Sequence, residues 1–214
     1  RANPVGKPQF PYADQFNAGY GTFRSTYTNR KTVVYVGAND GMLHAFDGAM
    51  TGTTAGSELF AFIPSFAYGD TTTAPTQGLA SLGNPNFAHH YLVDATAQNF
   101  DVDFNRTSGA TTTAPDWRTI LVGGLGKGGR GYYALDVTDP TSWISETAVA
   151  GKVLWEFTDP DMGYSFGEPR VVKTAKYGWT VLLSSGYSNA DGKAYLFLVN
   201  PRTGALLEKI ATSE

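Results

Sequence analysis

Three groups of oxygen-bearing side chains in this sequence are of the types that bind calcium. Two are the carboxylate pairs Asp101 with Asp103 and Asp159 with Asp161, and the third is the loop 188–192, which reads Ser-Asn-Ala-Asp-Gly. Calcium-binding loops alternate Asp or Asn with other residues and end in a Glu. None of the three groups follows that pattern, and turn formation explains each of them, because Asp and Asn side chains bind nearby backbone N–H groups. We therefore predict no metal ligand among them.

The histidines His44, His89 and His90 are the only nitrogen ligands for a transition metal, and no cysteine accompanies them. His44 lies in a predicted strand. His89 and His90 point to opposite faces if their segment is extended. We expect structural or surface roles for all three. No spacing suggests a Ser-His-Asp triad and no nucleophile-elbow motif is present, so we assign no catalytic residue.

The segment 124–129, Gly-Leu-Gly-Lys-Gly-Gly, has the letters of a dinucleotide-binding fingerprint and follows a predicted strand. That motif binds a pyrophosphate at the N-terminus of the helix that follows the loop. Here the strand-like segment 132–137 follows instead, and Lys127 is not followed by the Ser or Thr of a P-loop. We interpret Gly126 and Gly129 as hairpin-turn residues and predict no cofactor site.

The composition is that of an all-β protein. Of the 214 residues, 42% are hydrophobic, 14% are aromatic and 16% are charged, with 25 Gly and 11 Pro, which suits short strands joined by tight turns. The net charge of −3 argues against a nucleic-acid partner, which needs clustered Lys and Arg. No apolar run is long enough to cross a bilayer. The chain begins at Arg1 without a leader-like segment, so we expect any signal peptide to lie outside it.

Three units repeat one order of strands and turns, and such repeats are the strongest signal for the fold. Each unit has an apolar strand, a Gly-containing turn, a second strand ending in Asp or Asn, another turn and a third strand. The predicted strands are 32–37, 43–47 and 58–62, then 119–123, 133–136 and 153–157, then 180–184, 195–200 and 206–210. The recurring residue at the end of the second strand is Asp47, Asp136 or Asn200.

Glycines mark the hairpins of these units. Asn39-Asp40-Gly41 and Asp191-Gly192 lie where a hairpin needs a positive φ, which glycine adopts without steric cost. In the third strands, Phe60 and Trp155 occupy equivalent places, where we expect each ring to pack against the adjacent unit.

A further strand is predicted before each unit, at 6–10, 90–94 and 167–172. Four antiparallel strands per repeat is the blade of a β-propeller, so the predicted fold is an all-β propeller with about three blades of a larger ring. An ordinary sandwich of regularly spaced strands is the alternative.

The predicted blades span about 6–64, 89–160 and 167–210. Residues 65–88 and 105–116 are insertions rich in Thr, Pro and Gly, read as surface loops between blades, and both contain Thr-Thr-Thr-Ala-Pro. A closed propeller needs at least four blades, so we expect this chain to be part of something longer.

Three stretches resemble a known family, the PilY/PilC-type proteins associated with the tip of type IV pili. They are 35–47, which contains Ala-Asn-Asp-Gly-Met-Leu-His, then 117–140, and then 163–169, Gly-Tyr-Ser-Phe-Gly-Glu-Pro. The order of the motifs and their linking turns also match, and the similarity is weakest in the two Thr-rich insertions.

The resemblance implies the C-terminal, quinoprotein-like propeller of a large secreted or outer-membrane protein of Gram-negative bacteria. Such proteins lie at the pilus tip, work with minor pilins in pilus assembly and retraction, and mediate adhesion to host or abiotic surfaces. The implied partners are the remaining blades, the minor pilins and such a surface. The family is linked to calcium through an Asp-rich loop that has no match in this sequence. The family-like positions, expected to be structural turns, are Asn39, Asp40, Gly41, His44, Asp47, Gly126, Gly129, Asp136, Asp191 and Gly192.

Two other functions stay open. A quinone-cofactor dehydrogenase would share the repeat seen from Asp47 to Phe60, but the Cys pair that commonly lies beneath the quinone is missing. An outer-membrane assembly propeller would share the repeats without the motif at 35–47. We expect a non-enzymatic scaffold of the pilus machinery.

Overall fold

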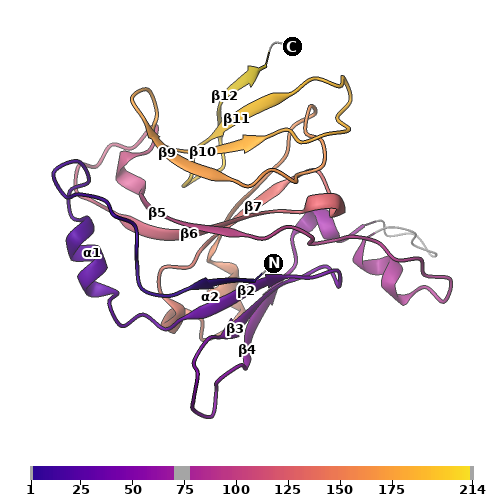
Figure 1. Cartoon of the computed structure of the whole chain (residues 1–214), viewed down its shortest axis with the longest axis horizontal. Coiled ribbons are helices and arrows are strands. Elements are labelled where there is room, and N and C mark those ends of the chain that lie inside the picture. Colours follow the sequence, from indigo (N-terminus) through magenta and orange to yellow (C-terminus); the bar gives the residue numbers. More distant parts are fainter. Residues whose placement is uncertain (1, 70–77, 213–214) are drawn as a thin grey trace.

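The computed structural model describes residues 2–69 and 78–212, which form three four-stranded antiparallel sheets (Figure 1). The first sheet contains β1 (Ala2–Val5), β2 (Val33–Gly37), β3 (Leu43–Asp47) and β4 (Glu58–Phe62). The second contains β5 (Gln98–Asp103), β6 (Trp117–Gly124), β7 (Tyr132–Asp136) and β8 (Val153–Phe157). The third contains β9 (Arg170–Thr174), β10 (Gly178–Ser184), β11 (Tyr195–Val199) and β12 (Leu206–Ala211). Strands that follow one another in the chain are neighbours in each sheet. Each sheet is therefore a propeller blade, as the repeats predicted, and the three blades form an open array.

Helices are short and lie in the connections. They are α1 (Tyr20–Thr26), α2 (Glu146–Ala150), and the 3₁₀ turns η1 (Ser65–Ala67), η2 (Leu79–Gly83), η3 (Phe104–Arg106), η4 (Gly126–Gly128) and η5 (Pro140–Ser142). Within residues 2–69 and 78–212, none of them has the length and apolar character needed to cross a bilayer.

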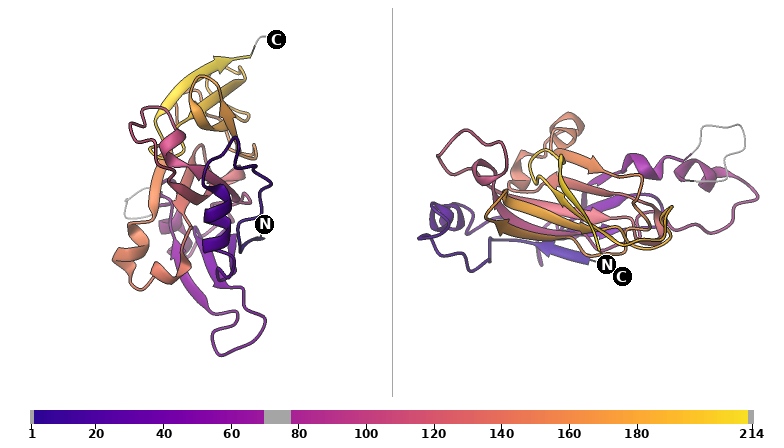
Figure 2. Two further views of the ribbon diagram at one scale, coloured as in Figure 1. Left: turned by 90° about the vertical axis from the view of Figure 1, so that its left-hand side faces the viewer. Right: turned by 90° about the horizontal axis from the view of Figure 1, so that it is seen from above.

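The cores of the protein lie between the blades. One apolar cluster joins the first and second blades and includes Tyr35, Leu43 and Tyr133. Another joins the second and third blades and includes Trp155 and Phe197. Figure 1 shows the blades following one another from the indigo end of the chain to the yellow end, and Figure 2 shows the same order from the side. The blades thus pack face to face, which is how a propeller buries its apolar strands.

Burial of the central strands follows from this stacking. In β3 of the first blade, buried and half-buried residues alternate, as expected for a strand with one covered face. In β6 of the second blade, all six residues from Thr119 to Gly124 are buried, because neighbouring blades cover both faces.

 Every residue of β6 other than Arg118 is buried, so the middle blade is enclosed on both sides.

The three blades also share one irregularity of register. A β-bulge interrupts the pairing of the third and fourth strands after Ala45, Ala134 and Leu198. Because the bulge falls at the same place, residues of the outer strands can be matched across blades. The residues paired with those three positions are Phe60, Trp155 and Glu208.

The aromatic rings at the first two of these positions pack against the next blade, as predicted. The indole Nε1 of Trp155 donates a hydrogen bond to the Pro201 carbonyl oxygen in the third blade at 2.9 Å. Phe60 meets the ring of Trp143, from the second blade, edge to face at 5.1 Å. Aromatic packing across each seam therefore joins neighbouring blades.

The predictions for the first strand of each blade need correction. In the first blade the strand is β1, and the predicted segment 6–10 follows it, because Gly6 and Pro8 end the extended run. In the second blade the predicted segment 90–94 is a connection, and the strand is β5. In the third blade β9 overlaps the prediction but begins only after Pro169.

The two insertions differ in their position relative to the blades. Residues 65–88 connect the first and second blades, and part of this connection, including Thr-Thr-Thr-Ala-Pro at 71–75, lies outside the described residues. Residues 105–116 connect β5 to β6 and thus lie inside the second blade, where we had expected a connection between blades. This loop contacts the third blade, where Asn200 Nδ2 donates to the Ser108 carbonyl oxygen at 3.0 Å.

Candidate functional site

The recurring acidic or amide residue of each blade closes a turn with its side chain. Asp47 Oδ1 accepts a hydrogen bond from the Ala49 backbone N–H at 3.0 Å, and Asp136 Oδ1 accepts one from Thr138 at 2.9 Å. Asn200 Oδ1 does the same for Arg202, also at 2.9 Å. The recurrence that identified the repeat thus has a local structural cause.

Asp47 is also held by an ion pair. Its Oδ2 lies 2.8 Å from Lys31 Nζ. The hydrogen bond from Lys31, helped by bonds from the Thr54 side chain and the Ala49 backbone, lowers the pKa of Asp47 to about 2. The carboxylate is therefore a permanently charged part of the turn at neutral pH.

The glycines of two hairpin turns have the positive φ that their sequence predicted, 95° at Gly41 and 72° at Gly192. Gly126 also has a positive φ of 59°, whereas Gly129 is extended, and a Cβ added at Gly129 would lie 2.5 Å from Leu125 Cδ1, so the Leu125 side chain would have to move. Strand β7 follows this loop, so the loop joins two antiparallel strands of the second blade and does not lead into the helix that a dinucleotide-binding motif requires.

Asn39 and Asp40 tie the first hairpin to its surroundings. Asn39 Oδ1 accepts a hydrogen bond from the Leu92 backbone N–H at 3.3 Å, which joins the turn to the connection before the second blade. Asp40 Oδ1 accepts one from Met42 at 3.0 Å within the turn. Both side chains thus act in the packing of this hairpin.

His44 lies between two carboxylates. Its Nε2 is 2.8 Å from Asp40 Oδ2, and its Nδ1 is 2.6 Å from Glu58 Oε1 on β4. Partial burial lowers the pKa of His44, but the hydrogen bonds and charges of Glu58 and Asp40 outweigh it, so the net shift is upward. The imidazole connects the hairpin to the outer strand.

His89 and His90 lie in the connection before β5, away from His44 in the sequence and without a shared ligand set. Their rings contact Tyr91 and Phe87, edge to face, at 5.0 Å and 6.1 Å. In the described part of the chain, no group of three or more His, Cys, Asp or Glu side chains could hold a metal ion.

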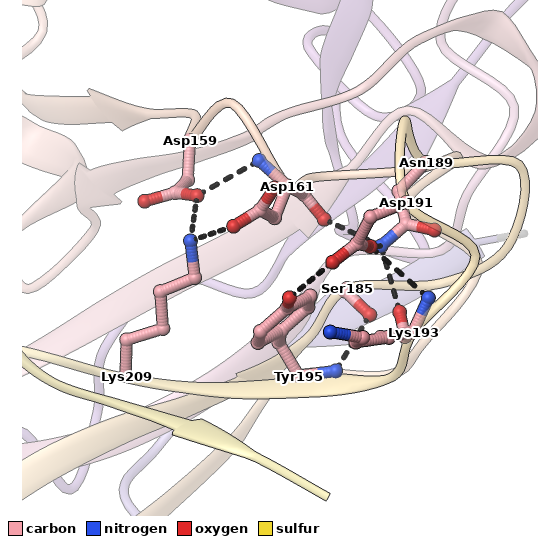
Figure 3. A network of polar contacts seen from close by, with 8 residues as sticks. All are labelled: Asp159, Asp161, Ser185, Asn189, Asp191, Lys193, Tyr195 and Lys209. Carbon is pink, nitrogen blue, oxygen red and sulfur yellow. Dashed lines mark hydrogen bonds and ion pairs between the residues drawn. The ribbon is translucent and has the colours of Figure 1, made fainter.

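Two of the candidate calcium groups meet at the seam between the second and third blades (Figure 3). Lys209 on β12 donates hydrogen bonds to Asp159 Oδ1, at 2.6 Å, and to Asp161 Oδ2. Partial burial raises the pKa of Asp159, but the hydrogen bond from Lys209 and one from the Asp161 backbone outweigh it and lower the pKa. The two carboxylates thus bind an ammonium group of the chain itself.

The hairpin loop of the third blade completes this polar network. Asn189 Nδ2 donates to the Asp161 carbonyl oxygen at 3.1 Å and to the Lys193 carbonyl oxygen at 2.7 Å. The hydroxyl of Tyr195 donates to Asp191 Oδ2, and this bond lowers the pKa of Asp191 and raises that of Tyr195 to about 12.

These residues do not fit a calcium ion. Calcium needs several oxygens converging on one point, but the point between Asp159 and Asp161 holds the ammonium group of Lys209. Asp191 is turned toward the Tyr195 hydroxyl (Figure 3). The network is therefore an ion-paired structural junction between the blades.

The remaining carboxylate pair has a structural role that the sequence did not reveal. Asp101 is 1% exposed and accepts hydrogen bonds from Tyr20 and Thr119, each at 2.6 Å. Burial raises the pKa of Asp101, and these bonds only partly oppose it. Asp103 Oδ1 accepts backbone bonds from Asn105, at 3.0 Å, and from residue 116, at 2.9 Å, which closes the loop 105–116.

Glu156 on β8, like Lys209 on β12, joins an outer strand to the connection that arrives from the preceding blade. It accepts hydrogen bonds from the backbone N–H of Ser65, at 2.7 Å, and from the Ser65 hydroxyl. Ser65 belongs to the connection that arrives from the first blade, as Asp159 and Asp161 belong to the one from the second. We call these two contacts the inter-blade clasps. The sequence signal that could have predicted the inter-blade clasps is a charged residue within the last, outer strand of a blade.

Comparison with known proteins agrees with this architecture. The family model described as the PilY1 beta-propeller domain matches residues 3–213. The type IV pilus biogenesis factor PilY1 of Pseudomonas aeruginosa strain PAO1 is 38% identical over 213 residues, which covers 96% of this chain and 16% of that protein. A PilY1 homolog of Xylella fastidiosa is also 38% identical, over 83% of this chain and 10% of its own length.

A solved structure gives the same result for the fold. The crystal structure of the Pseudomonas aeruginosa PilY1 C-terminal domain matches with a TM-score of 0.68 and 35% identity, over 99% of this chain and 37% of that one. The chain thus spans well under half of the proteins it matches. Its three blades, their repeated turns and these matches agree, and the chain belongs to the PilY1 β-propeller domain family.

Proposed function

We propose that the chain is a non-enzymatic propeller module of a type IV pilus biogenesis factor, acting as a scaffold for pilus assembly, retraction and surface attachment. The observation that carries this proposal is membership of the PilY1 propeller family, whose matching relatives are named as type IV pilus biogenesis factors. The alternative of an outer-membrane assembly propeller has no such support.

The polar side chains support a scaffold role. Asp47, Asp136 and Asn200 bind within their own turns, and the carboxylates of Asp159 and Asp161 both bind the ammonium group of Lys209. These contacts are structural, which supports a scaffold role rather than a catalytic one. We propose that the module works without a cofactor of its own.

The third blade has an apolar surface that further blades of the same protein could cover. Val172, Leu206 and Ile210 are 37%, 43% and 41% exposed on it. Blade faces in this protein are buried against neighbouring blades, so we infer that further blades of the same protein cover these side chains. Beyond the ring, we propose that the partners are minor pilins at the pilus tip and a host or abiotic surface, on the outside of a Gram-negative cell.

Deletion of residues 1–214 from the full-length protein tests the pilus role. We expect loss of surface pili, measured on sheared preparations, and loss of twitching motility, with both restored by the intact gene. An immunoblot must show that the shortened protein accumulates. Normal piliation and normal twitching in the deletion strain would contradict the proposal.

A separate assay tests the non-enzymatic part. The full-length protein is incubated with a quinone cofactor and calcium, and oxidation of alcohols and sugars is followed with an artificial electron acceptor. We expect no turnover above that of heat-denatured protein. Cofactor-dependent oxidation would support the dehydrogenase alternative instead.

A further inference from the structure

The outer strand of the first blade differs from the other two at one equivalent position. Counting from the shared bulge, Ala61 in β4 corresponds to Glu156 in β8 and to Lys209 in β12. The latter two residues form the inter-blade clasps. β4 therefore lacks the charge that the other two outer strands have at this point.

The rest of β4 is also uncharged after its first residue. From Leu59 to Ile63 the sequence reads Leu-Phe-Ala-Phe-Ile, whereas β8 contains Glu156 and β12 contains both Glu208 and Lys209. Charged residues in an edge strand prevent it from pairing with a strand of another molecule. The first blade lacks this protection, although the same fold provides it in the next two blades.

The backbone of β4 is available for such pairing. β4 is the last strand of its sheet, and it pairs only with β3. Within the described residues, Glu58–Phe62 form no backbone hydrogen bonds other than those to β3. The outer edge of β4 thus offers N–H and C=O groups to an added strand.

A groove beside this edge can take the side chains of such a strand. Its volume is about 670 Å³, and it lies between β4 and α2. Phe60, Trp143 and Ile144 are among its apolar lining residues, and Ile144 is 86% exposed. Helix α2, the other wall, has no buried residue. Glu146 is the only charged residue among the described ones that line the groove, which favours a basic residue next to the apolar part of the ligand.

We propose that the outer edge of β4 binds an extended apolar strand of a partner protein by β-strand addition, with the apolar side chains of that strand in the groove beside α2. The unprotected edge supplies the backbone hydrogen bonds, and Glu146 selects a strand flanked by Lys or Arg. This interaction goes beyond the proposed pilus role, because it assigns a binding edge whichever step of pilus function it serves.

Hydrogen exchange on the full-length protein tests the proposal. The probe is a synthetic nine-residue peptide of alternating Val and Thr with a Lys at each end, and the control peptide has Pro at every second position. We expect the probe to slow exchange in β4 by about tenfold or more at saturation, with no change in β8 or β12, because added backbone bonds protect amides. The Pro-containing peptide should have no effect.

Three outcomes would overturn the proposal. One is that β4 is already protected before the peptide is added, which would mean that another part of the protein covers it. Another is equal protection in all three outer strands. The third is concentration-dependent dimerisation through β4 in sedimentation, which would make a second copy the occupant. None of these outcomes depends on piliation, so they are separate from a failure of the pilus role.

A pair of matched substitutions gives a second test. Ala61→Lys introduces the charge that β12 has at the equivalent position, and Ala61 is exposed, so the blade should still fold. Ala190→Lys makes the same change at an exposed site in the hairpin of the third blade. We expect A61K to abolish the peptide effect and A190K to leave it intact, at unchanged thermal stability. Equal peptide binding by both variants would contradict the assignment.

Discussion

Tyr20 and Asp101, 81 positions apart in the chain, form a 2.6 Å hydrogen bond in the interior of the protein. Tyr20 lies in α1, within the long connection between β1 and β2, and Asp101 lies in β5. The bond therefore attaches an element of the first blade to the first strand of the second. It also satisfies a carboxylate that would otherwise be buried with fewer partners.

Replacing this hydroxyl should destabilise the protein in a pH-dependent way. Tyr20→Phe leaves the Asp101 carboxylate with the Thr119 bond, and we expect a loss of about 1–3 kcal/mol at neutral pH. The pKa of Asp101 is above its ordinary value, because burial dominates. Stability from this group therefore falls as pH rises through the folded pKa, and the loss of a bond to the charged form should cost more at pH 7 than at pH 4.

Urea unfolding at the two pH values measures this effect. Tyr27→Phe is the matched control, because the Tyr27 hydroxyl makes no hydrogen bond within the described residues. A pH-independent difference between Y20F and the parent protein would show that Asp101 is not the partner that matters.

The Trp155 seam bond should contribute a measurable part of the stability. Trp155→Phe keeps an aromatic ring but removes the N–H donor to the Pro201 carbonyl oxygen, and we expect a loss of about 1–2 kcal/mol. Trp155→Ala also empties the space beside Gly204 and should cost about 3–5 kcal/mol. Denaturant unfolding measures both losses, and a Trp155→Phe variant as stable as the parent protein would contradict a separate role for the N–H group.

The His44 contact should strengthen as the pH falls. The pKa of His44 lies above its ordinary value of 6.5. Its stabilising effect is therefore complete below the unfolded pKa and is lost as pH rises through the folded pKa. Because both carboxylates are partly exposed, we expect only about 0.5–1 kcal/mol.

An NMR titration of the His44 ring checks this prediction. The midpoint should lie above 6.5 and should fall in Asp40→Asn, which removes one carboxylate but keeps an oxygen for the turn. Glu168→Gln, a change in a distant ion pair, should leave the midpoint unchanged. If the midpoint in D40N equals that of the parent protein, Asp40 does not contribute to the raised pKa of His44.

Loss of Lys209 should affect the seam of the third blade. Lys209→Met keeps much of the side-chain volume but leaves Asp159 and Asp161 without their cation. We expect the pKa of Asp159 to rise toward its ordinary value of 3.8, since the hydrogen bond from Lys209 opposes burial. In the parent protein, the Asp159 carboxylate therefore stabilises the fold at pH values above its unfolded pKa of 3.8. This stabilisation is lost as the pH falls through the lower pKa of Asp159 in the folded protein.

Carboxyl NMR titration measures this shift, and calcium titration extends the test. We expect no calcium binding at this junction in the parent protein, because the ammonium group of Lys209 occupies the space between the carboxylates. Binding of calcium to the parent protein at this junction would contradict that interpretation.

The second to fourth strands of each blade were predictable because their apolar runs and turn residues act locally. Gly41 and Gly192 needed a positive φ, and the bounds of β3, β4 and β8 follow the pattern directly. The first strands were harder. In β5 the two carboxylates resembled calcium ligands, and only the folded structure places Asp101 beside the Tyr20 hydroxyl.

Contacts between distant segments were the part that the sequence could not provide. Lys209 and Asp159 were visible as charges, but their pairing depends on the stacking of two blades. Glu156 and Ser65 are 91 residues apart and meet for the same reason. Helix α1 was not predicted, since its seven residues give too short a pattern.

The location of the cores between blades has a mechanical consequence. Since each apolar core is shared by two sheets, no blade holds a complete core of its own, and detaching one blade exposes the face of the next. A pulling force along the array should therefore meet resistance at every seam together, and yielding at one seam should spread to its neighbours.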